Sequence, residues 1–211
     1  MDRIYSRELG EIVISSQNSI IIDAYDKTAA DQLAAVLCRL ISDKAEDFDD
    51  IVFVCIGTDR ATGDALGPLV GHLLAGSTAI VYGNLKKPVH ASNLLQSLEK
   101  IKQEHGNPLI VAIDACLGSS DKIGKLIAKE GGITPAMAVA GSLPAVGDMA
   151  IVGVVNVSAG ASGLCPLAVL SSTRLSIVMQ MAEVIAAGIS SFNLRIASDC
   201  KTNPPAPSLR G

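Results

Sequence analysis

The stretch VFVCIGTDRATGDALGPLVGHLL, residues 52–74, decides the fold class. Its first part, "VFVCIG", is almost wholly apolar and rich in β-branched residues, which predicts a strand that is buried on both faces. A polar loop follows, and apolar residues then recur at helical spacing, namely Leu66, Val70, Leu73 and Leu74. Pro68 is compatible with this helix because it lies in the first turn. A buried strand that leads into an amphipathic helix is the repeating unit of α/β folds.

The same alternation continues on both sides of this stretch. Before it, "TAADQLAAVLCRLISD" predicts a helix that begins near Thr28 and buries one apolar face. After it, "TAIVYG" predicts a strand, "ASNLLQSLEKIKQEHG" a helix closed by Gly106, and "PLIVAIDA" a second buried strand. This order of elements predicts an α/β fold with a largely parallel sheet.

The second half of the chain is less regular. "GKLIAKEGG" and "MAIVGVVNVSAG" predict strands, and residues 131–148 between them are rich in Gly, Ala and Pro, which predicts a loop. A long helix follows, for which Ser171 or Ser172 is the expected N-cap. We therefore expect an N-terminal arm or edge strand over 1–25, one α/β domain over 26–195, and a flexible tail over 196–211.

Composition excludes several classes of protein. The chain has 211 residues, of which 49% are hydrophobic and 18% charged, as expected for one globular domain. Its net charge is -4 with scattered basic residues, so no nucleic-acid-binding surface is predicted. Neither a signal peptide nor a membrane span is predicted, because the N-terminus is charged and polar residues interrupt each apolar stretch.

The cysteines indicate a reducing compartment. They are odd in number and far apart in the sequence, which predicts reduced thiols rather than disulfides: Cys38, Cys55, Cys116, Cys165 and Cys200. We therefore expect a cytoplasmic protein.

Two acids follow or end the predicted buried strands. Asp64 ends the loop after "VFVCIG", and Asp114 comes directly after five apolar residues. The carboxyl ends of parallel strands meet at one edge of a sheet, so the two side chains are expected to lie close together. Two adjacent carboxyl groups cannot both ionise freely, so such a pair holds one proton and one charge at neutral pH. This is the state that activates a water molecule and protonates a leaving amine.

Each acid also has a purely structural interpretation. Asp64 is well placed to cap the following helix, and Asp114 to cap the turn before "CLGSSD". Asp59 and Arg60 fit either a solvated turn or the lining of a site. Cys116 fits either a buried apolar residue or a reactive thiol.

Other known active-site motifs do not match. "GTDRATGD" lacks the ending that a phosphate-binding loop requires, and "GASG" is not a nucleophile elbow. The three histidines, His72, His90 and His105, lack the spacing of metal ligands, so neither a metal nor a cofactor is predicted.

The motifs "TGDALGP" and "LIVAIDACLGSS", in this order, resemble the germination protease family of spore-forming bacteria. The resemblance runs from about residue 50 to about residue 190. It includes "EGGITPAM" and "MAIVGVVNV", and is most specific to the germination-protease-like sporulation proteins. That family is similar in fold to hydrogenase-maturation endopeptidases. The resemblance therefore implies a three-layer α/β sandwich around a mixed, mostly parallel sheet, a phosphorylase/hydrolase-like architecture.

The resemblance also implies an activity. It gives Asp64 and Asp114 the roles of the essential pair of an unusual aspartic peptidase. Small acid-soluble spore proteins are the implied substrate, and the spore or forespore the implied compartment. The hydrogenase-maturation relatives bind nickel with a histidine from the second half of the chain. Because no histidine follows His105 here, a metal-recognising site is not expected.

The predicted site is completed by backbone and loop groups. Amide groups near Gly57 or Gly118 are expected to stabilise the oxyanion, and Thr58, Asp59 and Arg60 to line the substrate site. Two alternatives remain open: a non-catalytic binding or regulatory protein on the same fold, and a hydrolase of small amides or nucleosides. The sequence is compatible with a homo-oligomer.

Overall fold

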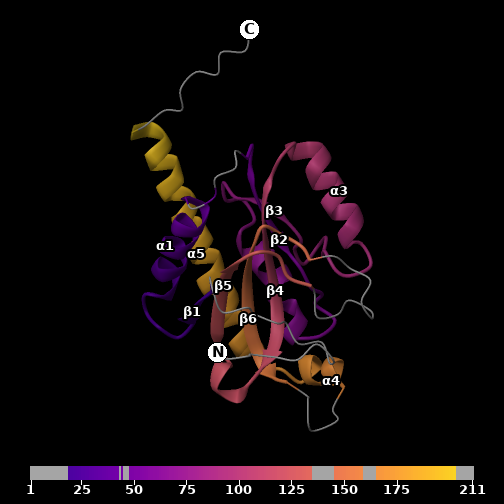
Figure 1. Ribbon diagram of the computed structural model, residues 1–211. Coiled ribbons are helices and arrows are strands. Elements are labelled where there is room, and N and C mark those ends of the chain that lie inside the picture. The colour runs from indigo at the N-terminus through magenta and orange to yellow at the C-terminus, as the bar shows by residue number, and fades with distance from the viewer. Residues whose placement is uncertain (1–18, 43, 45–47, 135–144, 159–164, 203–211) are drawn as a thin grey trace.

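Within the residues described by the computed structural model (19–42, 44, 48–134, 145–158 and 165–202, the last four by backbone alone), six strands form one sheet (Figure 1). The strands are β1 Ser19–Asp23, β2 Ile51–Cys55, β3 Ile80–Tyr82, β4 Leu109–Gly118, β5 Lys125–Glu130 and β6 Met149–Val157. Their order across the sheet is β1-β5-β6-β4-β2-β3. The first residues of the expected N-terminal arm and much of the loop over 131–148 lie outside the described residues.

The centre of the sheet is parallel and one side is antiparallel. β3, β2, β4 and β6 pair in parallel, whereas β5 runs antiparallel to β6 and β1 antiparallel to β5. A mixed, mostly parallel sheet was the expected architecture, and the α/β fold class is confirmed. β1 occupies one edge of the sheet.

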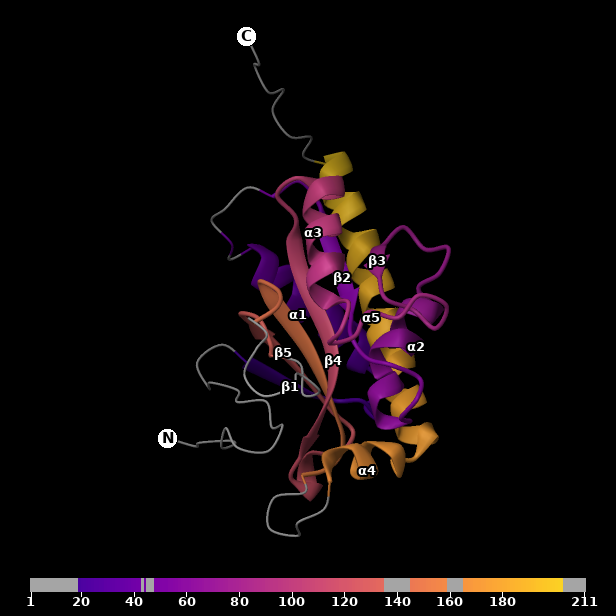
Figure 2. The same ribbon diagram turned by 90° about the vertical axis from the view of Figure 1, so that its right-hand side faces the viewer.

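Helices cover both faces of the sheet. They are α1 Ala29–Ser42, α2 Leu66–Leu73, α3 Leu94–His105, α4 Pro166–Ser171 and α5 Leu175–Thr202. α5 packs against both α1 and α2 on one face, and α3 lies on the other (Figures 1 and 2). The order α-layer, sheet, α-layer is a three-layer sandwich.

Strand β4 explains why the sheet needs both layers. All ten of its residues are buried. Val111, Ile113 and Ala115 belong to the hydrophobic cluster that includes α1, α2 and α5, whereas Ile110 and Ala112 belong to the cluster that includes α3. Alternate side chains of a strand point to opposite faces, so both faces of β4 are core.

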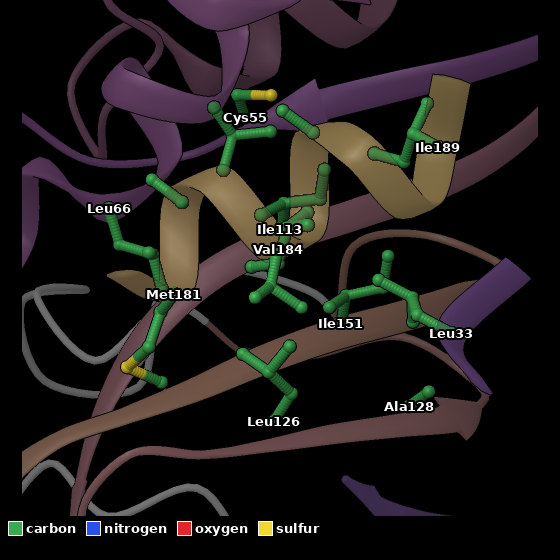
Figure 3. Packing of buried hydrophobic residues seen from close by; sticks show 14 of the residues in the cluster. Leu33, Cys55, Leu66, Ile113, Leu126, Ala128, Ile151, Met181, Val184 and Ile189 are labelled. Atoms are coloured by element: carbon green, nitrogen blue, oxygen red, sulfur yellow. The ribbon is translucent and has the colours of Figure 1, made fainter. Parts of the chain in front are cut away.

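The larger cluster joins the sheet to α1 and α5. Figure 3 shows Ile113 and Ile151 of the sheet facing Met181, Val184 and Ile189 of α5. Residues 175–198 of α5 are long and apolar enough to cross a membrane, but half of the most apolar window is buried inside the protein. The apolar composition of α5 is accounted for by this packing.

The start of α5 differs from the prediction. Ser171 ends α4 and Ser172 follows it, and α5 begins only at Leu175. The Ser172 and Thr173 hydroxyls each donate a hydrogen bond back to the Val169 carbonyl at 3.0 Å, so they close α4 and do not cap α5. At its other end α5 continues to Thr202, past residue 196 where a tail was expected.

The cysteines whose side chains the structure describes, Cys38, Cys55, Cys116 and Cys165, form no disulfide bond with one another. Cys55 and Cys116 are buried, Cys38 is partly buried, and Cys165 is exposed although its neighbours in the sequence are apolar. Burial raises the pKa of the Cys55 and Cys116 thiols. Cys116 is therefore a buried core residue and not a reactive thiol.

Candidate functional site

The chain reverses direction across the sheet between β2 and β4. From β2 it passes through α2 to β3 on one side, and from β3 it returns through α3 to β4 on the other side. At their carboxyl ends β2 and β4 lead to opposite sides of the sheet: the chain leaves β2 toward β3, and it leaves β4 toward β5, beyond β6. In open α/β sheets this divergence creates the crevice in which ligands bind.

Asp64 lies at this crevice. It is the middle residue of a short 3₁₀ turn, η1 Gly63–Ala65, that follows the loop after β2. Its side chain is buried, and its Oδ2 accepts a hydrogen bond from the Thr58 amide at 2.9 Å. The expected helix-capping role is wrong, because neither η1 nor α2 has a side-chain capping hydrogen bond. The carboxylate instead joins the end of the loop to its beginning, through the hydrogen bond from the Thr58 amide.

The surroundings of Asp64 favour a carboxyl group that holds a proton more tightly than usual. Burial raises its pKa, and this effect exceeds the opposing effects of the Thr58 hydrogen bond and the His90 charge. A carboxyl group with a raised pKa in a ligand-binding crevice is typical of acid–base sites.

Asp114 lies within β4 and not at its end. It is the sixth of ten residues, and the strand continues to Gly118. β2, however, ends at Cys55, which pairs with Ile113. Asp114 is therefore level with the first residue beyond β2 and still reaches the edge where β2 turns into its loop. Only 2% of Asp114 is exposed, and its Oδ1 accepts a hydrogen bond from the Ala115 amide at 2.8 Å.

The two acids are carried by elements that touch. The η1 turn, which holds Asp64, packs against β4, which holds Asp114. Asp114 points to the same face of the sheet as Cys116, the face that α3 covers. The structure therefore packs the turn that holds Asp64 against the strand that holds Asp114, and both residues are buried.

Two glycines of the opening stretch shape this crevice. Gly57 has φ +135°, and an added Cβ would lie 2.1 Å from the Asp64 carbonyl oxygen. Gly67 has an ordinary φ, but an added Cβ would lie 2.1 Å from the Ile56 carbonyl oxygen. Glycine at these positions lets η1 and α2 lie directly against the end of β2.

The expected oxyanion donors are not supported by the geometry. The Gly57 amide donates to the Val89 carbonyl at 2.8 Å, and the Thr58 amide donates to Asp64. Gly118 lies four residues beyond Asp114, which corresponds to roughly 13 Å along an extended strand. Gly57 and Thr58 therefore build the loop, and Gly118 lies away from the carboxyl pair.

The remaining predicted residues lie at the rim. Asp59 and Arg60 are both exposed, at the outer part of the loop between β2 and η1. The Arg60 amide donates to the Thr58 hydroxyl at 3.4 Å, which helps to hold this part of the loop. Their position is suited to contact with a ligand that enters the crevice from solvent.

One residue near the pair was not singled out from the sequence. His90 follows β3 on the loop that leads to α3, and its charge lowers the pKa of Asp64. The signal was available: β3 is parallel to β2, so the loop after β3 belongs to the same sheet edge as the loop that carries Asp64. Within the described chain, no group of three His, Cys, Asp or Glu side chains is arranged to hold a metal ion.

Comparison with known proteins identifies the family. The chain is 42% identical, over 183 residues, to "Uncharacterized protein YyaC" of Bacillus subtilis (strain 168), and the match covers 84% of this chain and 86% of that protein. A family model described as "Protein of unknown function (DUF1256)" matches residues 21–188, a range that includes Asp64, His90 and Asp114. The chain therefore belongs to the DUF1256 family.

Proposed function

We propose that this protein is a peptidase-like hydrolase in which Asp64 and Asp114 activate water against a peptide bond. One observation carries the proposal: the turn that holds Asp64 packs against the strand that holds Asp114, at the crevice where the connections of the sheet diverge. Both carboxyl groups are buried, with 7% and 2% of the residue exposed. Burying an ionisable acid costs free energy, and buried acids cluster at functional sites. Two buried acids at a crevice therefore favour a functional role.

The pair supplies both proton transfers of hydrolysis. The ionised carboxylate takes a proton from water as the water oxygen bonds to the carbonyl carbon. The protonated carboxyl group gives its proton to the amide nitrogen as the carbon–nitrogen bond breaks. One proton enters the pair and one leaves it, so the total charge of the pair is unchanged, and transfer of the proton between the two carboxyl groups, directly or through solvent, restores the starting state.

A peptide or protein substrate is favoured by the resemblance to germination protease. The motifs that carry the resemblance, "TGDALGP" and "LIVAIDA", contain the two acids, and the elements that hold these acids pack against each other. On this basis we propose a role in sporulation, with small acid-soluble spore proteins as the substrate and the cytoplasm of the forespore as the compartment. Asp59 and Arg60, exposed at the rim, are proposed to contact the substrate chain.

The test compares cleavage of small acid-soluble spore proteins by the wild type and three variants. Asp64→Asn and Asp114→Asn each keep the side-chain size and remove the titrating group, and we expect each to lower the cleavage rate by roughly 10²- to 10⁴-fold. Glu99→Gln, an exposed acid on α3, is the matched control and should cleave like the wild type. Fragments are identified by mass spectrometry.

Two results would count against the proposal. If both aspartate variants cleave at the wild-type rate, the carboxyl pair is not the catalytic group. If the purified wild type binds the spore proteins in a pull-down and cleaves none of them, the fold serves a binding or regulatory function instead.

A further inference from the structure

His90 is held beside the loop that carries Asp64. Val89 forms a parallel bridge with Ile56, and the Gly57 amide donates to the Val89 carbonyl at 2.8 Å. The next residue of each segment belongs to the crevice: His90 follows Val89, and Thr58, which donates to the Asp64 carboxylate, follows Gly57. The Val89 carbonyl and the Asp64 carboxylate therefore accept hydrogen bonds from consecutive amides, those of Gly57 and Thr58.

The His90 ring is also fixed locally. The His90 amide donates to Asn93 Oδ1 at 2.8 Å, and Asn93 Nδ2 donates to the Pro88 carbonyl at 3.0 Å. Ser92 Oγ lies 2.8 Å from Nδ1 of the ring. A turn held at its backbone and at one ring nitrogen restricts the orientation of the imidazole, which is typical of histidines with a positioning role.

Of the charged groups that the structure describes around Asp64, His90 is the one whose charge lowers the pKa of the Asp64 carboxyl group. Asp114 is contributed by β4, and Asp59 and Arg60 by the loop itself, where both are exposed. α2 carries only His72, which is exposed, and α4 carries no charged residue. α5 reaches η1 with its first turns, which are uncharged up to Glu183.

We propose that His90 is a positioning residue that opposes the effect of burial on Asp64 and so favours the ionised form of the Asp64 carboxyl group. Asp64 is then the base that takes the proton from water, and Asp114 is the acid that protonates the leaving nitrogen. The observations behind this assignment are the backbone link through Val89 and Gly57, the fixed ring, and the lowering of the Asp64 pKa by the His90 charge. The acid and base roles rest on the proposed function, whereas the coupling between His90 and Asp64 does not.

The coupling is tested without a substrate. Full-length protein labelled with ¹³C in the aspartate carboxyl groups is titrated by NMR, and the Asp64 resonance is assigned by its absence in Asp64→Asn. His90→Gln removes the charge and keeps a polar side chain, so we expect the titration midpoint of Asp64 to move to higher pH. His72→Gln is the matched control, because His72 is exposed on α2, and should leave the midpoint unchanged. Equal Asp64 midpoints in the wild type and His90→Gln would overturn the inference, provided that both proteins give the same far-UV circular dichroism spectrum.

A second readout separates this inference from the proposed function. If the wild type cleaves a peptide substrate, the acidic limb of the pH–rate profile should move to higher pH in His90→Gln. An unchanged limb would refute the assignment of Asp64 as the base. If the wild type cleaves nothing but the Asp64 midpoint still moves in His90→Gln, the peptidase proposal fails and the positioning of Asp64 by His90 stands.

Discussion

Replacing Gly57 with alanine should destabilise the protein more than the same replacement at another glycine with positive φ. Gly76 is the matched control: its φ is +83°, and an added Cβ would have no atom within 4 Å. Gly76→Ala therefore introduces backbone strain alone, which costs about 1–2 kcal/mol. Gly57→Ala has at least this strain, because φ +135° lies further from the left-handed region that alanine can adopt, and it adds a steric overlap, since the new Cβ would lie 2.1 Å from the Asp64 carbonyl oxygen.

The size of the additional effect follows from what the overlap displaces. Ordinary contact begins near 3.4 Å, so the Asp64 backbone must move away by about 1.3 Å, the difference between 3.4 and 2.1 Å. The Thr58 amide, which donates to the carbonyl and the carboxylate of Asp64 at 3.1 and 2.9 Å, cannot keep both contacts. A hydrogen bond to a charged group contributes about 1.5–3 kcal/mol. We therefore expect Gly57→Ala to cost about 3–5 kcal/mol in total.

Urea unfolding followed by far-UV circular dichroism measures the difference, since the chain has no tryptophan for fluorescence. The free energy of unfolding should fall in both variants, with the larger decrease in Gly57→Ala. Equal decreases would mean that the loop after β2 accommodates a Cβ without moving Asp64. The role assigned to Gly57 in shaping the crevice would then be incorrect.

Two further measurements test the surroundings of the buried groups. Burial raises the pKa of Asp64 above its ordinary value of 3.8, so the folded state binds this proton more tightly than the unfolded state does. The contribution of Asp64 to stability is therefore fully present below pH 3.8 and is lost as the pH rises through the folded-state value. Asp64→Asn, which stays neutral, should gain in unfolding free energy relative to the wild type between acidic and neutral pH; a constant difference in urea unfolding would contradict this reasoning. In native protein, iodoacetamide should alkylate Cys165 faster than Cys55 and Cys116, because Cys165 alone of the three is exposed. Peptide mass spectrometry measures the three rates. Equal rates at Cys116 and Cys165 would disprove the burial of Cys116.

Local patterns in the sequence predicted most of the elements. The apolar run of β2, the helical spacing around Leu33 and Leu37, and the closure of α3 at Gly106 are confirmed, because each depends on residues close together in the chain. The second buried strand was predicted over "PLIVAIDA", residues 108–115, and β4 runs three residues further, to Gly118. A buried acid within a strand breaks the apolar pattern without breaking the backbone pairing.

The residues of the candidate site were likewise predicted only in part from the sequence. Both acids were identified from their positions after apolar runs, since an ionisable group next to a buried strand is visible in the sequence itself. The capping role of Asp64 was wrong, because its carboxylate accepts a hydrogen bond from the Thr58 amide, in the loop before the helix. His90 was not singled out because its sequence neighbours form no site motif, and its position follows only from the place of β3 beside β2 in the sheet.

The sequence by itself determined that this chain forms helices and strands with both faces of a central sheet buried, and that two aspartates lie near its carboxyl edge. Hydrophobic periodicity reports burial over a few residues, and burial is what those predictions needed. The tertiary structure decided that β5 and β1 run antiparallel to their neighbours, that η1 packs on β4, and that the loop after β3 brings His90 to Asp64. These contacts join segments far apart in the chain, and their geometry depends on the packing of the whole sheet.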